Sequence, residues 1–504
     1  MLRRTTAIPS YNAQSVGITP EIPESAKAFD SAGSEAAAEV AIAKQEAGLR
    51  RQLSAGQMAM VAVGGSIGTG LLLGSGAAIQ IAGPAVILTF AIGAFLAWTV
   101  TNALGEMASV HPAAGSFGLY ADLYLSRWAG FVVRYSYWMS LVVAIGSELI
   151  AAATYVHFWF PNLPGVLLVA IFAATLLFLN LRSVGDYGRV EYWLAMIKVA
   201  TIVAFVLLGA SFLLAGQVAP QYRIFGGFMP HGAASPLLAV SFALFSFLGV
   251  EFLAVSSGEA RARSEIPRAA RRMFALLTFV YVGATTVLVG VMPWERAGVS
   301  QSPFVTVFQV AGLPAVSGVM NFVVLTAALS GANASLYVAA RMLFSLARSG
   351  YAPAPLGRLS GAGEPRWALL VSAVGILIAM LTSQFTPERA YLYIIGGSLF
   401  GGMLAWCISL AAHVSFRRRL SAEQVAALPM RAPGGAAMST IGFLGVAIAV
   451  MSTWWVPQSR ITVMSGPPGL LILTAGYLLV RRRAKRAGQL EAASDAVVQP
   501  TPPL

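Results

Sequence analysis

Four glycines lie within seven residues of an early apolar stretch, which reads Gly64-Gly65-Ser66-Ile67-Gly68-Thr69-Gly70. Each glycine in a helix interior costs about 1 kcal/mol relative to alanine, so this composition favours a break in the helix. A helix that restarts after the break has unpaired amides and a partial positive charge, which suit a carboxylate. Ser66 and Thr69 add hydroxyl groups on the same turn. Close packing of small residues between helices is the competing interpretation.

The same stretch also matches the Gly-x-Ser-x-Gly pattern of serine hydrolases, as Gly64, Ser66 and Gly68. That nucleophile elbow requires a strand-to-helix turn together with a histidine and an acid. The histidines all fall outside the middle of the apolar segments, at His111, His157, His231 and His413. We therefore disfavour a hydrolase and expect no catalytic residues and no enzymatic activity.

A second apolar segment contains Phe245-Ser246-Phe247-Leu248-Gly249-Val250-Glu251, which places a small polar residue, a glycine and a carboxylate near its middle. Two interrupted helices at corresponding positions of two halves are typical of transporters built from inverted repeats, whose site lies at the midplane of the membrane. Phe245 could cover a bound ligand as an aromatic lid, although an aromatic residue in a membrane helix is usually there for packing. The pair of breaks therefore predicts a binding site between them.

Few ionisable residues occur within the apolar segments, and each is a functional candidate because burying a charge in lipid is costly. They are Lys198, Glu148, Glu251 and Glu106. A desolvated lysine can exchange its proton near neutral pH, so Lys198 could carry a proton where another protein would bind a metal cation. A fixed ion pair is the alternative for Lys198. Glu106 lies near a loop and is predicted to be structural; we expect no metal site and no cofactor.

The composition indicates a polytopic membrane protein, because 57% of the 504 residues are hydrophobic, 11% are charged and the mean hydropathy is +0.73. A single cysteine, Cys407, excludes an intramolecular disulfide. The first fifty residues have no apolar core of a cleavable signal peptide, so the first membrane helix is expected to direct insertion. Apolar runs of spanning length predict twelve transmembrane helices. Their ranges are 57–81, 84–109, 131–160, 164–181, 190–215, 236–258, 272–293, 315–346, 367–384, 391–415, 438–456 and 464–480.

The positive charges follow the loops on one side of this topology. With both termini in the cytoplasm, the inner segments hold 28 of the 33 lysines and arginines and the outer loops hold four, at Arg223, Arg296, Arg389 and Arg460. The net charge of +13 is thus explained by contacts with anionic lipid rather than with nucleic acid. We expect cytoplasmic tails at 1–50, without fixed structure, and 487–504, around a single membrane domain at 51–486.

Several motifs occur in the order typical of one transporter superfamily. They are Gly65-Ser66-Ile67-Gly68-Thr69-Gly70-Leu71 with Ala82-Gly83-Pro84; Leu104-Gly105-Glu106-Met107-Ala108; Tyr137-Trp138; Glu191-Tyr192-Trp193 with Ile197-Lys198-Val199; Phe245-Ser246-Phe247 with Gly249-Val250-Glu251; and Gly258-Glu259-Ala260 before Ile266-Pro267-Arg268-Ala269. Over about residues 50 to 485 the chain resembles the amino acid–polyamine–organocation (APC) superfamily, closest to the bacterial amino acid permeases. It departs from the family at Arg261 to Glu265, where an Asn-Pro is usual.

The resemblance implies a twelve-helix, LeuT-like fold with discontinuous helices 1 and 6. The two inverted repeats would cover about 57–215 and 236–415, and two extra helices about 438–480. It also implies where a substrate binds. The α-carboxylate would meet the first break, at Gly65, Ser66, Ile67, Gly68, Thr69 and Gly70, and the amino group would meet the second, at Phe245, Ser246, Leu248 and Gly249.

The same resemblance implies roles for three of the ionisable or aromatic residues. Lys198 matches a lysine that proton-driven relatives have where sodium-coupled ones bind the ion. Phe245 and Glu251 match an aromatic gate and a glutamate of the arginine–agmatine antiporter. We group Lys198, Glu251 and Glu148 as the candidates for proton coupling.

These observations predict a transporter of the cell membrane, with a bacterial inner membrane as its expected location, that imports an amino acid together with protons. An exchanger of amino acids or amines is the alternative, and a sensor that binds without transport is a remote one. The expected partners are an amino acid and membrane lipid. The identity of the amino acid and the oligomeric state are left open by the sequence.

Overall fold

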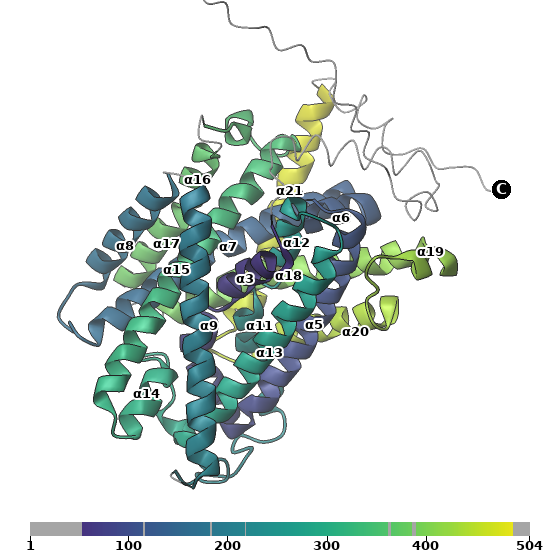
Figure 1. The fold of residues 1–504 in the computed structure, drawn as a ribbon. Helices are drawn as coiled ribbons and strands as arrows, with labels where there is room; N and C mark the ends of the chain where they lie inside the picture. Colours follow the sequence, from purple (N-terminus) through teal and green to yellow (C-terminus); the bar gives the residue numbers. More distant parts are fainter. Residues whose placement is uncertain are drawn as a thin grey trace, which may run out of the picture.

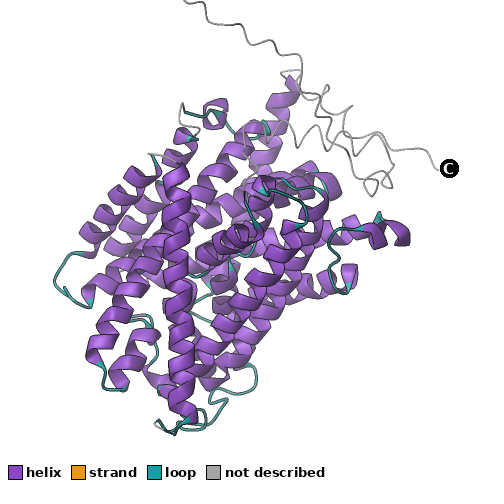
Figure 2. Ribbon diagram, viewed as in Figure 1, coloured by secondary structure: helices purple, strands orange, loops and turns teal. Residues whose placement is uncertain are grey.

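The computed structural model describes residues 53–113, 116–181, 184–216, 218–360, 364–385 and 390–486. The predicted tails, 1–50 and 487–504, lie outside the described residues. Within those ranges the regular secondary structure is helical (Figure 2), and extended pairing is limited to an isolated bridge between Leu53 and Ala260. The all-α class predicted from the sequence is therefore confirmed.

The helices divide into two halves along the chain. Those of the first half are α3 (Ala55–Ser66), the π-helix η1 (Gly70–Gly74), α4 (Ser75–Ala82), α5 (Val86–Val110), α6 (Ser116–Tyr124), α7 (Arg127–His157), α8 (Gly165–Asn180) and α9 (Val184–Leu214). Those of the second half are α10 (Ser235–Leu238), α11 (Val240–Phe247), α12 (Phe252–Ser256), α13 (Glu265–Val291), α14 (Pro303–Val310), α15 (Pro314–Arg348), α16 (Arg366–Ser372), α17 (Val374–Phe385), α18 (Ala390–Arg418), α19 (Ala422–Ala427), α20 (Gly435–Ser452) and α21 (Ile461–Arg486).

Local sequence explains where the first helix begins. Ser54 caps α3 through its side chain, and Gln57 closes a reciprocal capping box. The next free amide, that of Ala55, donates to Glu265 at the start of α13 over 2.7 Å. Glu265 belongs to the segment that departs from the family pattern, so this segment helps to position the start of α3.

Eight helical segments of the described chain are long and apolar enough to cross a membrane, judged by length and composition. Three shorter apolar segments accompany them, at Gly165–Asn180, Val240–Ser256 and Arg366–Leu381. The longest segment, Gly70–Val110, contains a turn at Gly83, whose φ of 60° is readily adopted by glycine. This turn lies where the sequence predicts the boundary between two spans. The count of twelve remains a prediction, because eight of the described segments have the length and hydropathy of a spanning helix and three others are shorter.

The long helix α7 lies at the centre of the packing and contacts α15, α18, α17 and α6 (Figure 1). A second group of helices, α3, α5, α9 and α12, packs around α13, and α11 packs against α5. The last two helices, α20 and α21, lie against α18. In their most apolar 18-residue stretches only 22% and 11% of the residues are buried. Such largely uncovered apolar surfaces are suited to contact with lipid.

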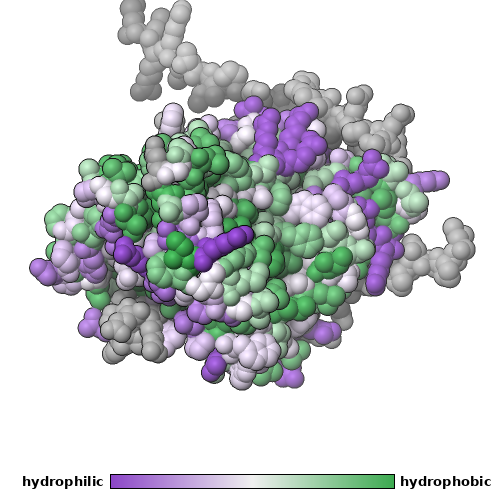
Figure 3. All heavy atoms as spheres, turned by 90° about the horizontal axis from the view of Figure 1, so that it is seen from below, coloured by the Kyte–Doolittle hydropathy of each residue, from purple (hydrophilic) through white to green (hydrophobic). Residues whose placement is uncertain are grey.

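The lower end of the bundle in Figure 1 carries the loop between α9 and α10, where most residues from 218 to 234 are exposed or half-buried. Figure 3 views the molecule from this side and shows hydrophilic residues interspersed with hydrophobic ones. A mixed surface of this kind is suited to water and headgroups rather than to the hydrocarbon core.

Two buried charge clusters connect helices outside the predicted site. Glu106 on α5 lies 2.5 Å from Arg417 Nε and 3.1 Å from His413 Nε2, both on α18, and it also accepts a hydrogen bond from the amide of Ala432. Arg134 on α7 is fully buried and contacts Asp122 of α6 at 2.6 Å. Glu106 thus occupies a structural ion cluster, as its position near a loop predicts, and Arg134 is a buried cation that the sequence did not single out.

Candidate functional site

The predicted interruption of the first membrane helix is present. α3 ends at Ser66, and Ile67 leaves helical geometry with ψ of 87°. The chain resumes as the π-helix η1 at Gly70, a rare conformation that is frequent at functional sites. Ile67 and Gly68 therefore form an unwound link within the segment of highest glycine density, and Thr69, in helical geometry, leads into η1.

Side chains from several helices bind the freed backbone groups of this link. On the amide side, Thr69 N donates to both carboxylate oxygens of Glu148 on α7, each over 3.2 Å. On the carbonyl side, Lys198 Nζ on α9 donates to Gly64 O over 2.6 Å and to Ile67 O over 3.1 Å. The hydroxyl of Tyr391 on α18 donates to Thr69 O over 2.7 Å. The break is thus a meeting point of α7, α9 and α18.

Two glycines at the first break, Gly68 and Gly70, are required by close contacts. A Cβ on Gly68 would lie 2.5 Å from Glu148 Oε1, and a Cβ on Gly70 would lie 2.7 Å from the Cα of Ser246. The hydroxyl of Ser66 donates to Ala62 O within its own helix, so it is already engaged. The small residues are therefore consistent with both interpretations of the sequence, because they lie at a break in the helix and also allow close packing with neighbouring helices.

The second interruption is also present, between α11 and α12. Leu248 leaves helical geometry with ψ of 133°, and Gly249 adopts φ of +113°, which other residues rarely adopt. Gly249 lies against the first break, because a Cβ there would be 2.7 Å from Ser66 Oγ. The two breaks predicted from separate stretches of sequence are therefore in contact.

One tyrosine bridges the two breaks. The hydroxyl of Tyr281 on α13 lies 2.7 Å from Ser66 O and 2.8 Å from Ser246 O. A hydroxyl has a single proton, so it donates to one of these carbonyls at a time. Nothing in the sequence singled out Tyr281 or Tyr391, because buried aromatic residues in membrane helices mostly serve packing.

The candidates for proton coupling fall into two separate groups. Glu251 belongs to the second break, where Tyr137 Oη donates to it over 2.6 Å and Trp406 Nε1 over 3.1 Å. Lys198 and Glu148 both contact the first break and are buried. The structure therefore brings Lys198 and Glu148 to one place and positions Glu251 at another.

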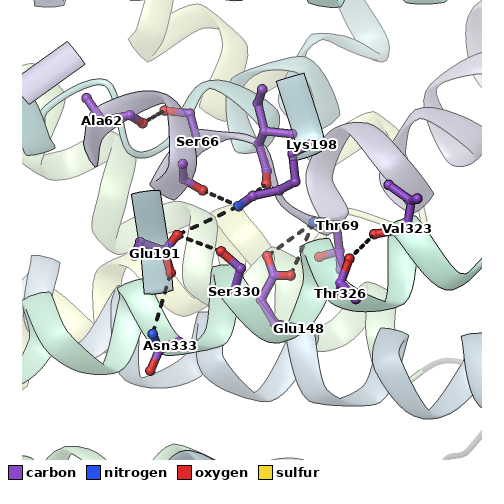
Figure 4. A network of polar contacts seen from close by, with 12 residues as sticks. Ala62, Ser66, Thr69, Glu148, Glu191, Lys198, Val323, Thr326, Ser330 and Asn333 are labelled. Atoms are coloured by element: carbon purple, nitrogen blue, oxygen red, sulfur yellow. Dashed lines mark hydrogen bonds and ion pairs between the residues drawn. The ribbon is translucent and has the colours of Figure 1, made fainter. Parts of the chain in front are cut away.

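A further buried carboxylate, Glu191, accompanies Lys198 on α9 (Figure 4). Its Oε1 lies 3.9 Å from Lys198 Nζ and accepts a hydrogen bond from Ser330 Oγ of α15 over 2.5 Å. Its Oε2 accepts from Asn333 Nδ2 over 3.5 Å. In the sequence Glu191 stood out only as part of a motif. Its spacing of seven residues from Lys198, about two helical turns, was the available signal that both share one face of α9.

Most of the predicted site residues are buried, among them Ser66, Thr69, Phe245 and Ser246, whereas Gly65 and Leu248 are half-buried. Phe245 packs against the start of η1, since a Cβ on Gly70 would lie 3.0 Å from its ring. An apolar groove of about 630 Å³ opens elsewhere, between α7, α18, α20 and α21. It includes no residue of either break and faces the side where lipid is expected.

Solved structures of known proteins share this fold. The chain is similar to the manganese transporter of Eremococcus coleocola, with a TM-score of 0.53 and 15% sequence identity over 86% of this chain and 94% of that one. A solved mutant of the same transporter gives a TM-score of 0.55 at 16% identity, with the same coverage. At this identity the similarity concerns the fold alone.

Sequence comparisons define the family. The amino acid permease family model matches residues 57–487, and the chain belongs to this family, within the APC superfamily. It is 35% identical over 447 residues to the aromatic amino acid transport protein AroP of Escherichia coli K12, covering 87% of this chain and 97% of AroP. It is 34% identical over 442 residues to the uncharacterized amino acid permease YtnA of Bacillus subtilis, covering 86% and 96%. The family and these relatives are transporters rather than enzymes.

Proposed function

We propose that this protein imports an amino acid across the cell membrane together with protons. Membership of the amino acid permease family supports amino acid transport. The observation that carries the proton hypothesis is the buried ammonium of Lys198, which donates to two backbone carbonyls of the first break. Carbonyls at a helix break are the groups that hold a coupling cation in transporters of this architecture, and here the cation is part of the protein.

The substrate would bind between the two breaks. Its carboxylate would bind amides of the first break, from Gly65 to Gly70, and its amino group would bind carbonyls of Phe245, Ser246 and Leu248 beside Gly249. In the structure the Thr69 amide is held by the carboxylate of Glu148. A substrate carboxylate would therefore compete with Glu148 for this amide. Because AroP is named for aromatic amino acid transport, aromatic amino acids are the first substrates to test.

Proton coupling would act through the contact between α9 and α3. Protonated Lys198 ties α9 to the first break through Gly64 O and Ile67 O. The neutral amine has lost one N–H donor and its charge, so each remaining bond is weaker than a charge-assisted one. Loss of the proton would loosen the break and favour the state that releases substrate to the cytoplasm. Glu251 would connect the second break to α7 and α18 through the hydrogen bonds that it accepts from Tyr137 and Trp406, and a change in its protonation would alter these bonds.

For the membrane arrangement, we propose a LeuT-like fold of twelve spanning helices in a bacterial inner membrane, with both termini in the cytoplasm. The distribution of lysine and arginine supports this orientation. Alternating access would arise from movement of spans 1, 2, 6 and 7 against the remaining helices.

Uptake into proteoliposomes tests the proposal. We expect the wild type to accumulate at least one amino acid when the outside is acidic, and Lys198→Ala to lose this accumulation. Arg418→Ala, which removes an exposed cation of α18, is the control and should keep it. Accumulation by Lys198→Ala driven by the pH gradient would refute coupling through Lys198. Counterflow without any pH-driven uptake in the wild type would instead identify an exchanger, and binding without uptake a sensor.

A further inference from the structure

The ammonium of Lys198 has one face directed away from the first break. A lysine has three N–H donors, and two of them serve Gly64 O and Ile67 O. The remaining direction leads toward Glu191, whose Oε1 lies 3.9 Å away. Glu191 also touches α3, since a Cβ on Gly64 would lie 3.1 Å from the same oxygen. Lys198 is therefore positioned between the break and a carboxylate of its own helix.

Two carboxylates interact electrostatically with Lys198, and they lie in different environments. Glu148 of α7 binds the amide of Thr69, at the break itself. Glu191 is located two turns nearer the start of α9, about 10 Å along the helix from Lys198. If α9 begins in the cytoplasm, as proposed above, Glu191 lies on the cytoplasmic side of Lys198.

Further polar side chains lie between Glu191 and the end of the bundle where α8 ends and α9 begins. Ser330 and Asn333 of α15 both donate to its carboxylate, and Asn333 Oδ1 in turn accepts from Asn180 Nδ2 over 2.6 Å. Asn180 is the last residue of α8, next to the connection to α9. Figure 4 shows the dashed contacts that join Glu191 to Lys198, Ser330 and Asn333. The buried carboxylate thus has polar partners leading to the α8–α9 connection.

We infer that Glu191 is the group that accepts the proton of Lys198 on its way to the cytoplasm. This inference rests on the proposed function and names the inner half of its proton path. In the transfer an N–H bond of the ammonium breaks and an O–H bond forms on Glu191 Oε1, so an ion pair becomes a neutral amine and a neutral carboxylic acid. No net charge is created in the buried site. The proton is then released on the cytoplasmic side, which restores the carboxylate.

The step requires two local movements. Lys198 must shorten the 3.9 Å separation to hydrogen-bonding distance, which it can do on releasing Gly64 O. The hydroxyl of Ser330, which donates to Glu191 Oε1, must turn away or accept when that oxygen becomes protonated. A hydroxyl can reverse its role in this way, whereas the amide nitrogen of Asn333 can only donate.

Glu191→Gln separates a proton acceptor from a structural partner, because it keeps the size and removes the basicity. We expect it to lower pH-driven accumulation by about tenfold or more, as for loss of a positioned proton acceptor. Amino acid counterflow, which needs no net proton movement, should stay close to wild type. Glu423→Gln, which removes an exposed carboxylate of α19, is the matched control and should leave both activities unchanged.

The dependence on internal pH provides the second readout. In the wild type, raising the pH inside the vesicles should speed net uptake, and in Glu191→Gln this response should be flattened. Ser330→Ala should shift the response without abolishing it, and it covers the case in which Glu191→Gln does not fold. Wild-type pH-driven uptake by Glu191→Gln would overturn the inference, as would loss of counterflow in a folded variant, which assigns a structural role. Absence of pH-driven uptake in the wild type would instead overturn the proposed function.

Discussion

Gly70→Ala tests whether the contact between the two breaks is essential for binding. The new Cβ would lie 2.7 Å from the Cα of Ser246 and 3.0 Å from the ring of Phe245. The first of these neighbours is backbone, so α11 has to move away by on the order of 1 Å to restore van der Waals contact. Overpacking of this kind typically costs about 1–3 kcal/mol. If about 2 kcal/mol falls on the ligand-bound state, the Kd for the amino acid rises about 30-fold.

Neighbouring glycines provide the controls for this measurement. Gly68→Ala meets the carboxylate of Glu148, which can turn aside, so its effect should be smaller. Gly56→Ala, in the first turn of α3, meets nothing within 4 Å and should bind as the wild type does. Affinity is measured by ligand-induced thermal shift or radioligand binding in detergent, on protein that elutes as the wild type does. Wild-type affinity in Gly70→Ala would refute the reasoning and leave this segment a packing contact only.

Two further predictions concern stability. Tyr281→Phe removes the donor that bridges Ser66 O and Ser246 O and leaves a buried carbonyl unpaired, so it should destabilise the protein by about 1–3 kcal/mol. Tyr222, which is half-buried and donates to Thr286 O, provides the control, and thermal melts should show a smaller loss of stability for Tyr222→Phe. Equal losses in the two variants would contradict the bridging role of Tyr281. Burial lowers the pKa of His111, at the end of α5, to about 4. In the unfolded chain His111 binds its proton near pH 6.5, so the stability that the neutral ring gives above pH 6.5 is lost as the pH falls toward 4, by about 2 kcal/mol between pH 7 and pH 5. Over the same pH range His111→Gln should lose about 2 kcal/mol less stability than the wild type. An equal loss in both proteins would show that His111 does not cause the pH dependence.

The sequence predicted the features that are encoded locally. Glycine density at Gly64 to Gly70 predicted the first break, and Gly249 beside a carboxylate predicted the second, because each cause acts within one turn of helix. The buried cation at the first break was likewise visible as a single lysine, Lys198, in an apolar segment. That the two breaks and Lys198 lie close together was inferred from the architecture of transporters rather than from the residues themselves.

The remaining parts of the site depend on contacts between distant segments. Ser330 and Asn333 lie 139 and 142 residues from Glu191, and nothing near Glu191 in the sequence shows that they bury and bind it. Tyr281 reaches across to carbonyls on two other helices, which no periodicity reveals. The number of spanning helices also stays a prediction, since eight helical segments of the described chain are long and apolar enough to cross a membrane and three shorter apolar ones accompany them.

The shared proton of Tyr281 has a thermodynamic consequence for the two halves of the site. Donation to Ser66 O leaves Ser246 O free to accept from another group, and donation to Ser246 O leaves Ser66 O free. A ligand ammonium that binds Ser246 O therefore favours the rotamer that stabilises Ser66 O, and by reciprocity strengthening the bond to Ser66 O raises the affinity of Ser246 O for the ligand. The two breaks thus act as linked equilibria through the orientation of one hydroxyl.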